Sequence, residues 1–217
     1  MTTKHQLRTE LAQAAARAVA AGLAPGTSGN ASVRLSGGLL VTPSGAALGK
    51  LEPHDLVELD AAGAVLAGRL RPSTEWRLHA GIYAARPEVA AIMHTHSPHA
   101  TSLSTLRRGI PAYHYMVAMA GGSSIPCTAY ETFGSAELAA RVVAALRDRQ
   151  ATLLANHGVV AVGRDLSAAL SLAIEVEALA AGYLRALAVG EPAILPDDEM
   201  ARVLEQFRDY GRVVARR

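Results

Sequence analysis

Hydrophobic and polar residues follow two patterns along the chain, one typical of helices and one typical of strands. Residues 3–21 place apolar side chains on one helical face, and Thr3 and Gln6 predict a capping box at its start. Short apolar runs separated by turn residues predict strands and hairpins. The predicted helices are 3–21, from Ser73 or Thr74 to 86, 97–106, 135–147, 166–189 and 197–210. The predicted strands are 31–35, 39–41, 57–59, 65–66, 89–93, 152–154 and 159–162, and 109–130 is predicted to be irregular.

The stretch 166–189 is apolar on nearly every side, with Glu175, Glu177 and Arg185 as exceptions. A helix of this kind is buried on most sides, either against a sheet or in a subunit interface. The chain contains no repeat, linker or low-complexity segment. We therefore expect a single domain over residues 1–217, an α/β fold with helices on both faces of a sheet.

Composition excludes several classes of protein. Apolar residues make up 50% of the chain and charged residues 18%, which is too apolar for a disordered chain. A net charge of +2 without a basic cluster argues against nucleic-acid binding. The absence of a long uncharged apolar run argues against a membrane span, and the charges near the N-terminus argue against a signal peptide. We expect a cytoplasmic protein.

Histidines supply the clearest candidate chemistry. His94 and His96 follow an apolar strand, and residues two apart in an extended chain point to the same side, so both rings can reach one ion. His157 precedes Gly158, which we expect to allow a sharp bend, and Glu75 lies near a helix start. Three histidines and a carboxylate are a donor set suited to tetrahedral Zn²⁺. Spacing alone, however, does not bring His157 and Glu75 to the histidine pair.

The remaining histidines are expected to lie outside the site; they are His5, His54, His79, His99 and His114. His79 follows Glu75 by about one helical turn, so it can pair with Glu75 or with a metal. The favoured interpretation is a core histidine whose ring nitrogens are hydrogen-bonded.

Three loops rich in glycine and hydroxyl residues are candidates for an anion site: 26–30, 42–45 and 73–74. Around a helix N-terminus, their N–H groups and hydroxyls would bind a phosphate without a lysine. Only Lys4 and Lys50 are lysines among the 21 basic residues. A sugar phosphate is therefore the expected ligand, and chemistry through a lysine imine is disfavoured.

Taken together, these motifs resemble the zinc-dependent class II aldolase/adducin-like family, in particular its L-fuculose-1-phosphate aldolase branch. The motifs are Gly26-Thr27-Ser28-Gly29-Asn30, Thr42-Pro43-Ser44-Gly45, Pro72-Ser73-Thr74-Glu75-Trp76, His94-Thr95-His96, Ile110-Pro111-Ala112-Tyr113-His114-Tyr115-Met116, Gly121-Gly122-Ser123-Ser124-Ile125-Pro126, Thr132-Phe133-Gly134 and Asn156-His157-Gly158. The departures are modest, since Thr74 stands where the aldolase commonly has Ser and Ser44 where it often has Thr.

The resemblance implies a three-layer αβα sandwich with a mainly antiparallel sheet, and a homotetramer with active sites at subunit interfaces. It implies one Zn²⁺ per subunit, with catalytic roles for Glu75 and Tyr115. The implied metal ligands are Glu75, His94, His96 and His157. The implied substrate-binding residues are Gly29, Asn30, Ser44, Gly45, Ser73 and Thr74, mainly for the phosphate, and Phe133 and Tyr210 at the aldehyde end.

The implied reaction is the reversible cleavage of a ketose 1-phosphate to dihydroxyacetone phosphate and an aldehyde through a zinc-bound ene-diolate. Three histidines and Glu75 would close a tetrahedral site, whereas catalytic zinc normally keeps a position open. We expect substrate oxygens to displace Glu75, whose carboxylate then moves the proton at the carbon that was C3. Tyr115 would serve the C4 oxygen.

Two alternatives remain at this point. A ribulose-5-phosphate 4-epimerase-type enzyme would use the same retro-aldol chemistry, but that branch has Asp in place of Glu75 and lacks the Tyr115 motif. An adducin-like binding module would lack the metal ligands, which are complete here. The residues do not separate L-fuculose 1-phosphate from a pentulose, 5-deoxypentulose or 5-methylthioribulose 1-phosphate.

Overall fold

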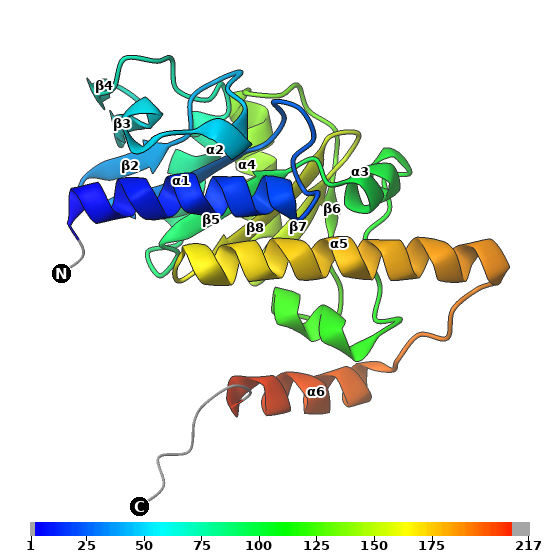
Figure 1. The fold of residues 1–217 in the computed structure, drawn as a ribbon. Coiled ribbons are helices and arrows are strands. Elements are labelled where there is room, and N and C mark those ends of the chain that lie inside the picture. The colour runs from blue at the N-terminus through cyan, green and yellow to red at the C-terminus, as the bar shows by residue number, and fades with distance from the viewer. Residues whose placement is uncertain (1–2, 210–217) are drawn as a thin grey trace, which may run out of the picture.

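One sheet of eight strands runs through the middle of the molecule (Figure 1). The computed structural model describes residues 3–209. The strands are β1 (Asn30–Leu35), β2 (Gly38–Val41), β3 (Val57–Asp60), β4 (Val65–Ala67), β5 (Ala91–Thr95), β6 (Cys127–Thr128), β7 (Ala151–Leu154) and β8 (Gly158–Gly163). Their order is β4-β3-β2-β1-β5-β8-β7-β6, and each neighbouring pair is antiparallel except β6 and β7.

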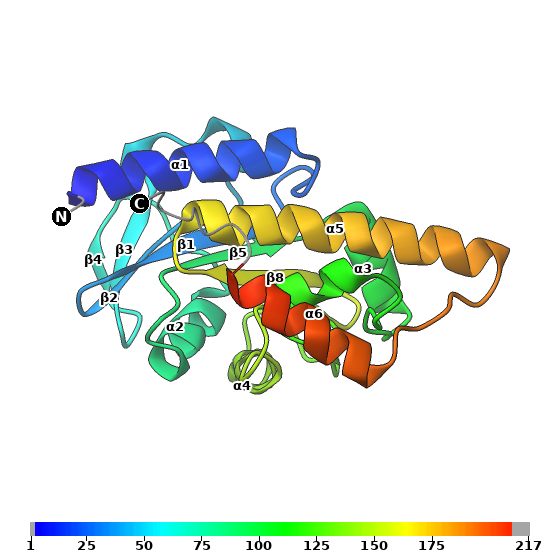
Figure 2. The same ribbon diagram turned by 90° about the horizontal axis from the view of Figure 1, so that it is seen from below.

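Helices cover both faces of this sheet. The α-helices are α1 (Lys4–Ala20), α2 (Trp76–Ala85), α3 (Pro98–Thr105), α4 (Ala136–Ala145), α5 (Leu166–Val189) and α6 (Asp197–Asp209). The 3-10 helices are η1 (Leu48–Lys50), η2 (Pro53–Asp55) and η3 (Tyr115–Ala120). Figure 2 shows α1 and α5 on one face of the sheet and α2 and α4 on the other. The three-layer αβα sandwich with a mainly antiparallel sheet is thus confirmed.

Each face of the sheet has its own hydrophobic core, because successive strand residues point to opposite sides. In β5, Ala91 and Met93 are buried with residues of α1 and α5. Ile92 is buried instead with residues of α2 and α4. His94 lies two residues after Ile92, so β5 carries its ring on the α2 side of the sheet.

The strand that carries His94 differs from its predicted range. The apolar run predicts a strand over 89–93, whereas β5 spans Ala91–Thr95. The reason is pairing on both sides: His94 lies opposite Asn30 of β1 and Val160 of β8. Backbone pairing with two neighbours extends the strand past the last apolar residue, so His94 belongs to the sheet interior.

The start of α2 also differs from the prediction. Neither Ser73 nor Thr74 is its N-cap; the helix begins at Trp76, with Glu75 in the N-cap position. The Ser73 hydroxyl accepts a hydrogen bond from the Glu75 N–H, which stabilises a turn before the helix. Glu75 therefore lies at the junction of loop and helix. In the predicted irregular stretch 109–130, the structure has η3 and β6.

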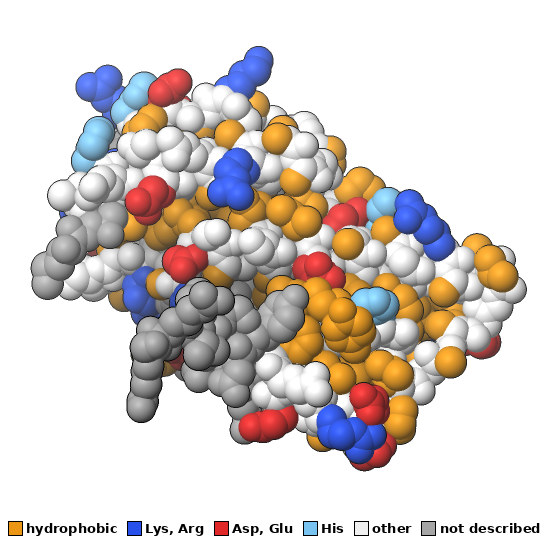
Figure 3. Space-filling model, turned by 60° about the horizontal axis from the view of Figure 1, so that its bottom comes forward, with side chains coloured by type: hydrophobic (Ala, Val, Ile, Leu, Met, Phe, Trp, Pro, Cys, Tyr) orange, Lys and Arg blue, Asp and Glu red, His pale blue; other side chains and the backbone are white. Residues whose placement is uncertain are grey.

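Helix α5 spans the predicted residues and packs against the sheet along one side. Its outer side is not fully covered, since Ile174 is exposed. Hydrophobic side chains also gather on the face of the molecule that carries α5 and α6 (Figure 3). Within residues 3–209, none of the helices has both the length and the apolar character that crossing a membrane requires.

Candidate metal centre

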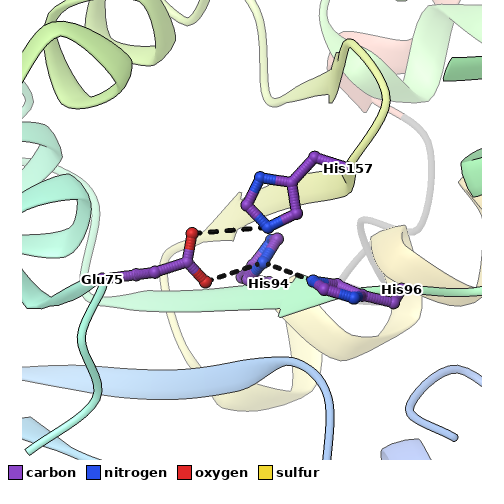
Figure 4. Close-up of side chains that lie close together, drawn as sticks. All are labelled: Glu75, His94, His96 and His157. Carbon is purple, nitrogen blue, oxygen red and sulfur yellow. Dashed lines mark hydrogen bonds and ion pairs between the residues drawn. The ribbon is translucent and has the colours of Figure 1, made fainter. Parts of the chain in front are cut away.

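Four side chains from three separate segments converge where the central strand β5 ends. Glu75 precedes α2, His94 lies in β5, His96 directly follows that strand, and His157 comes from the turn between β7 and β8 (Figure 4). One ligand atom of each lies within 4.8 Å of the others. Glu75 and His94 are buried, and His96 and His157 are partly exposed. The fold therefore joins the histidine pair to the two residues that spacing alone left apart.

Three of the distances between these ligand atoms are close to the edge length of a coordination tetrahedron. Zinc ligands about 2.0–2.1 Å from the ion lie about 3.3 Å from one another. The His94 Nε2 atom is 3.1 Å from His96 Nε2 and 3.0 Å from Glu75 Oε2. The His157 Nε2 atom is 3.4 Å from Glu75 Oε1. The cluster has the size that a single first-row divalent ion requires.

The backbone determines which nitrogen of His94 faces the cluster. The Val159 carbonyl oxygen can only accept, so His94 Nδ1, 3.0 Å away, carries the proton and donates it. Nε2 is therefore the ring atom that faces Glu75 Oε2 and His96 Nε2. A metal ion bound there would take the lone pair of this nitrogen, and the Val159 carbonyl would hold the ring in the orientation that binding requires.

The charges within the cluster favour an ionised carboxylate at Glu75 and neutral rings at His96 and His157, whereas they favour the charged form of His94. Burial raises the pKa of Glu75, but the His94 and His157 rings outweigh it and hold that pKa well below its usual range. Burial and the charge of His94 lower the pKa of His96 to about 3 and that of His157 to about 4. Burial also opposes protonation of His94, yet Glu75 outweighs it and raises the pKa of His94. Two rings are therefore deprotonated at neutral pH, as metal binding requires.

One carboxylate oxygen of the cluster lacks a hydrogen bond. Glu75 Oε2 accepts from the Asn30 side-chain amide at 2.9 Å. Glu75 Oε1 is buried and has no hydrogen-bond partner among the described residues. A buried carboxylate oxygen without a donor is costly unless a cation compensates it. The three imidazoles and this oxygen thus fit a bound divalent metal ion.

The turn that carries His157 bends for a different reason than the sequence suggests. Asn156 adopts a left-handed φ of 54°, whereas Gly158 does not lie in that region, so the expectation that Gly158 provides the bend is wrong. Gly158 is required by a close approach instead. A Cβ atom there would lie 2.4 Å from the Thr95 carbonyl oxygen and 3.1 Å from His96 Cδ2.

The Gly158→Ala variant is therefore expected to lose stability and metal affinity together. Overpacking of this kind destabilises a fold by about 1–3 kcal/mol, and the displaced Thr95 carbonyl and His96 ring carry the disturbance to the cluster. Urea unfolding and a zinc competition titration measure the two effects. Gly190→Ala is the control, because no described heavy atom lies within 4 Å of a Cβ at that position. Equal stability of the two variants would contradict the steric argument.

A cleft of about 290 Å³ opens beside the cluster. Two loops that line it are held together by backbone hydrogen bonds, from Ser73 N to the Thr42 carbonyl at 3.1 Å and from Ser44 N to the Arg71 carbonyl at 2.9 Å. The predicted substrate-binding residues that line it are Gly29, Asn30, Ser44, Gly45, Ser73, Thr74 and Phe133. Glu75, His96 and His157 also line it, and the buried His94 lies beneath them.

Two predicted residues are not found in this cleft. Tyr115 lies on η3, is 50% exposed and does not line the cleft. Its ring stacks on that of His114, with 4.8 Å between the ring centroids. Tyr210 lies outside the described residues. The cleft is also lined by Tyr130, Glu131 and Asn156, which are not among the predicted site residues. Asn156 was detectable as the neighbour of a candidate ligand, but nothing in the sequence singles out the other two.

His79 is a hydrogen-bonded core histidine, as the favoured interpretation predicts. Its ring is fully buried, with Nδ1 2.6 Å from the Ser32 hydroxyl and Nε2 2.5 Å from Asn30 Oδ1. It is not one of the four clustered residues. His99 lies apart from them as well, with Nδ1 2.7 Å from Glu177 Oε1 of α5.

Comparison with known proteins places this geometry in a family. Residues 9–184 match the family model described as Class II Aldolase and Adducin N-terminal domain. A 5-methylthioribulose-1-phosphate/5-deoxyribulose-1-phosphate aldolase of Rhodospirillum rubrum is 53% identical over 205 residues, which are 94% of this chain and 92% of that protein. An L-fuculose phosphate aldolase of Escherichia coli (strain K12) is 49% identical over 191 residues, 88% of either chain.

The structural comparison agrees with the sequence comparison. A solved structure of L-fuculose 1-phosphate aldolase has a TM-score of 0.90 at 38% identity, covering 93% of this chain and 96% of that one. The family match spans most of the chain, and the similarity to both aldolases extends over nearly their whole length. We conclude that the chain belongs to the class II aldolase family and is a carbon–carbon lyase.

Proposed function

We propose that this enzyme is a zinc-dependent aldolase that reversibly cleaves a ketose 1-phosphate to dihydroxyacetone phosphate and an aldehyde. The observation that carries the proposal is a Glu/His₃ cluster beside a cleft lined by hydroxyl and glycine residues. One end of this cleft suits a metal and the other suits a phosphate. Both aldolases described above are named for a sugar phosphate, which supports the same class of substrate here.

The phosphate end is built from neutral donors. Ser44, Ser73 and Thr74 bring hydroxyls to the cleft, and Gly29 and Gly45 lie in its loops. Of the residues described as lining the cleft, none is Lys or Arg. Hydroxyls and backbone N–H groups bind a phosphate in such sites by oriented dipoles. We assign these residues to the phosphate of the ketose.

Glu75 is the base that this arrangement offers. A divalent ion on the three histidines would act as a Lewis acid, stabilising the negative charge that develops when the C3–C4 bond breaks. Glu75 Oε2 is held by Asn30, whereas Oε1 has no hydrogen-bond partner among the described residues. In our proposal the Glu75 carboxylate moves the proton at the carbon that was C3.

Tyr115 is proposed to act on the substrate of a neighbouring subunit in a homotetramer. Its ring is half-exposed on η3 and does not line the cleft of its own chain. The hydrophobic side chains around α5 and α6 provide a surface that a second copy would cover (Figure 3). Tyr115 would serve the C4 oxygen, while Phe133 and Tyr210 would shape the aldehyde end of the site.

The Tyr115→Phe variant is expected to slow cleavage with little change in zinc content or in phosphate affinity, because only the aldehyde end loses a proton partner. Mixing it with Glu75→Gln subunits provides the test. Reassembled oligomers regain part of the activity, because some sites combine an intact Glu75 with an intact Tyr115 from the next chain. No recovery, despite proven mixing, would contradict action between subunits.

A panel of ketose 1-phosphates tests the proposed function. L-fuculose, 5-deoxyribulose and 5-methylthioribulose 1-phosphates are incubated with the zinc-loaded protein, and released dihydroxyacetone phosphate is measured with a coupled reductase. The proposal expects release from at least one of them. A pentulose 5-phosphate is incubated in parallel, and its epimerisation without release of dihydroxyacetone phosphate from the panel would indicate the epimerase alternative. The absence of bound metal and of turnover would indicate a binding module.

A further inference from the structure

A continuous chain of buried hydrogen bonds leads from α2 through β1 to the carboxylate of Glu75. The Tyr83 hydroxyl is 2.8 Å from the Ser32 hydroxyl, which is 2.6 Å from His79 Nδ1. His79 Nε2 is 2.5 Å from Asn30 Oδ1, and Asn30 Nδ2 is 2.9 Å from Glu75 Oε2. All five side chains are buried. The chain thus connects the core between sheet and helix to the candidate metal centre.

Only one direction of donation satisfies every atom of this chain. The Glu75 carboxylate accepts, so Asn30 must present its N–H to it and its oxygen to His79. That oxygen also only accepts, so His79 Nε2 carries the proton. Burial lowers the pKa of His79 to about 3, so the ring is neutral and Nδ1 accepts from Ser32. Ser32 in turn accepts from the Tyr83 hydroxyl.

The placement of these residues follows from two sequence spacings. Asn30 and Ser32 are two apart in β1 and share one face of the sheet. His79 and Tyr83 are four apart in α2 and share one face of that helix. Since α2 covers this face of the sheet, the two pairs meet and alternate as donors and acceptors.

The orientation of the Asn30 amide is the step on which the metal centre depends. Rotating that amide by half a turn would place its oxygen against Glu75 Oε2, where two acceptors repel each other. It would also leave the amide N–H facing the proton of His79 Nε2. A neutral His79 with its proton on Nε2 therefore excludes the rotated amide, and the Ser32 hydroxyl maintains that tautomer.

We propose that Tyr83, Ser32 and His79 are positioning residues, which orient the Asn30 amide so that its N–H holds Glu75 Oε2 at the metal centre. This proposal rests on the proposed function, because it assigns Glu75 to metal binding and proton transfer. The proposal also explains why Glu75 Oε1 has no hydrogen-bond partner among the described residues: the Asn30 N–H binds Oε2 instead. Groups that hydrogen-bond a metal ligand typically change metal affinity or activity by about 10–100-fold when they are removed.

Two substitutions of His79 in the full-length protein test this proposal. His79→Gln keeps an N–H that can reach Asn30, whereas His79→Leu keeps the volume without a donor. We measure the Kd for Zn²⁺ by chelator competition, the visible spectrum of the Co²⁺-loaded protein, kcat and KM separately, and the Tm without metal. His79→Leu is expected to weaken zinc binding by up to about 10-fold, the lower end of this range because His79 acts through Asn30, and to alter the Co²⁺ spectrum and lower kcat. His79→Gln is expected to lie closer to the wild type in zinc affinity, in the Co²⁺ spectrum and in kcat.

A merely structural role would give a different result. If both His79 variants lower the Tm but bind zinc with wild-type affinity and show the wild-type Co²⁺ spectrum, the proposal is overturned. Equal losses of metal affinity in His79→Gln and His79→Leu would also overturn it, because the retained N–H would then have no effect.

Tyr83, at the far end of the chain of hydrogen bonds, provides a second test with a matched control. This test is sufficient by itself if His79→Leu does not fold. Tyr83→Phe removes the first donor without changing the packing of the ring. Tyr183→Phe removes the hydroxyl of another buried tyrosine, on α5, which lies 3.4 Å from Arg108 Nη2 and outside this chain of hydrogen bonds. The proposal expects an altered Co²⁺ spectrum and weaker zinc binding in Tyr83→Phe only. Equal effects in both variants, or no effect in Tyr83→Phe, would overturn it.

The experiments distinguish a wrong assignment of the positioning residues from a wrong assignment of the function. A wild-type protein that binds no zinc and releases no dihydroxyacetone phosphate would contradict the function itself. A wild-type protein that does both, together with variants that match it in metal affinity and spectrum, would contradict the positioning role alone.

Discussion

The His94→Ala, His96→Ala and His157→Ala variants are each expected to lose both bound zinc and sugar-phosphate cleavage. Each removes one of three imidazole nitrogens from a cluster in which three pairs of ligand atoms lie 3.0–3.4 Å apart, and two rings with a displaceable carboxylate hold zinc poorly. Metal analysis after dialysis and a coupled assay for dihydroxyacetone phosphate measure the two losses.

His99→Ala is the matched control for these variants. His99 also pairs with a glutamate, at 2.7 Å from Glu177, but it lies outside the cluster. The control is expected to keep its zinc and its activity. A cluster variant that retained full metal and full turnover would show that its histidine does not hold the metal.

Glu75→Gln is expected to lower the turnover number by at least about 10²-fold, the usual scale for a general base, while zinc still binds with lower affinity. The amide keeps a carbonyl oxygen for the metal but cannot take up a proton at carbon. The variant also lacks the charge that the Asn30 N–H and the His94 ring favour. Steady-state kinetics and zinc competition separate the two effects.

Glu58→Gln is the control for this substitution. Glu58 is a second buried carboxylate, with Oε1 2.8 Å from Lys4 Nζ, and it does not line the cleft. Its replacement is expected to affect stability but not turnover. A nearly normal rate in Glu75→Gln would show that Glu75 is a ligand only and that the proton moves through another group.

Local patterns were sufficient to predict most of the elements and half of the metal cluster. The capping box at Thr3 and Gln6 and the bounds of α5 follow from residues within a few positions of one another, and both are present in the structure. The alternation of side chains along a strand likewise predicts that His94 and His96 point to one side. Such predictions need only the geometry of one element.

The remaining half of the cluster depends on strand pairing across long stretches of chain. Asn30 lies opposite His94, and His94 lies opposite Val160, so β1 and β8 flank the central histidine. This register brings Asn30 and the turn that carries His157 to the same end of the central strands. No local pattern encodes that pairing, and in the sequence only the motifs shared with a known family connect these residues.

The function of His79 was also beyond the reach of local patterns. Its spacing from Glu75 allows a direct contact, although the favoured interpretation is a hydrogen-bonded core histidine, which the structure confirms. What the spacing does not predict is that Asn30 lies between His79 and Glu75 in the chain of hydrogen bonds. Similarly, the need for Gly158 arises from the approach of the Thr95 carbonyl from β5. Both effects come from contacts between elements.

Zinc titration of the metal-free enzyme tests whether a metal ion at the Glu/His₃ cluster is required for cleavage. The protein is stripped with a chelator, zinc is added in known equivalents, and release of dihydroxyacetone phosphate from the best ketose 1-phosphate of the panel is followed. We expect no release without metal and a rise that saturates at one zinc per chain. Cleavage by the metal-free protein, or no cleavage of any tested ketose 1-phosphate at saturation, would contradict this expectation.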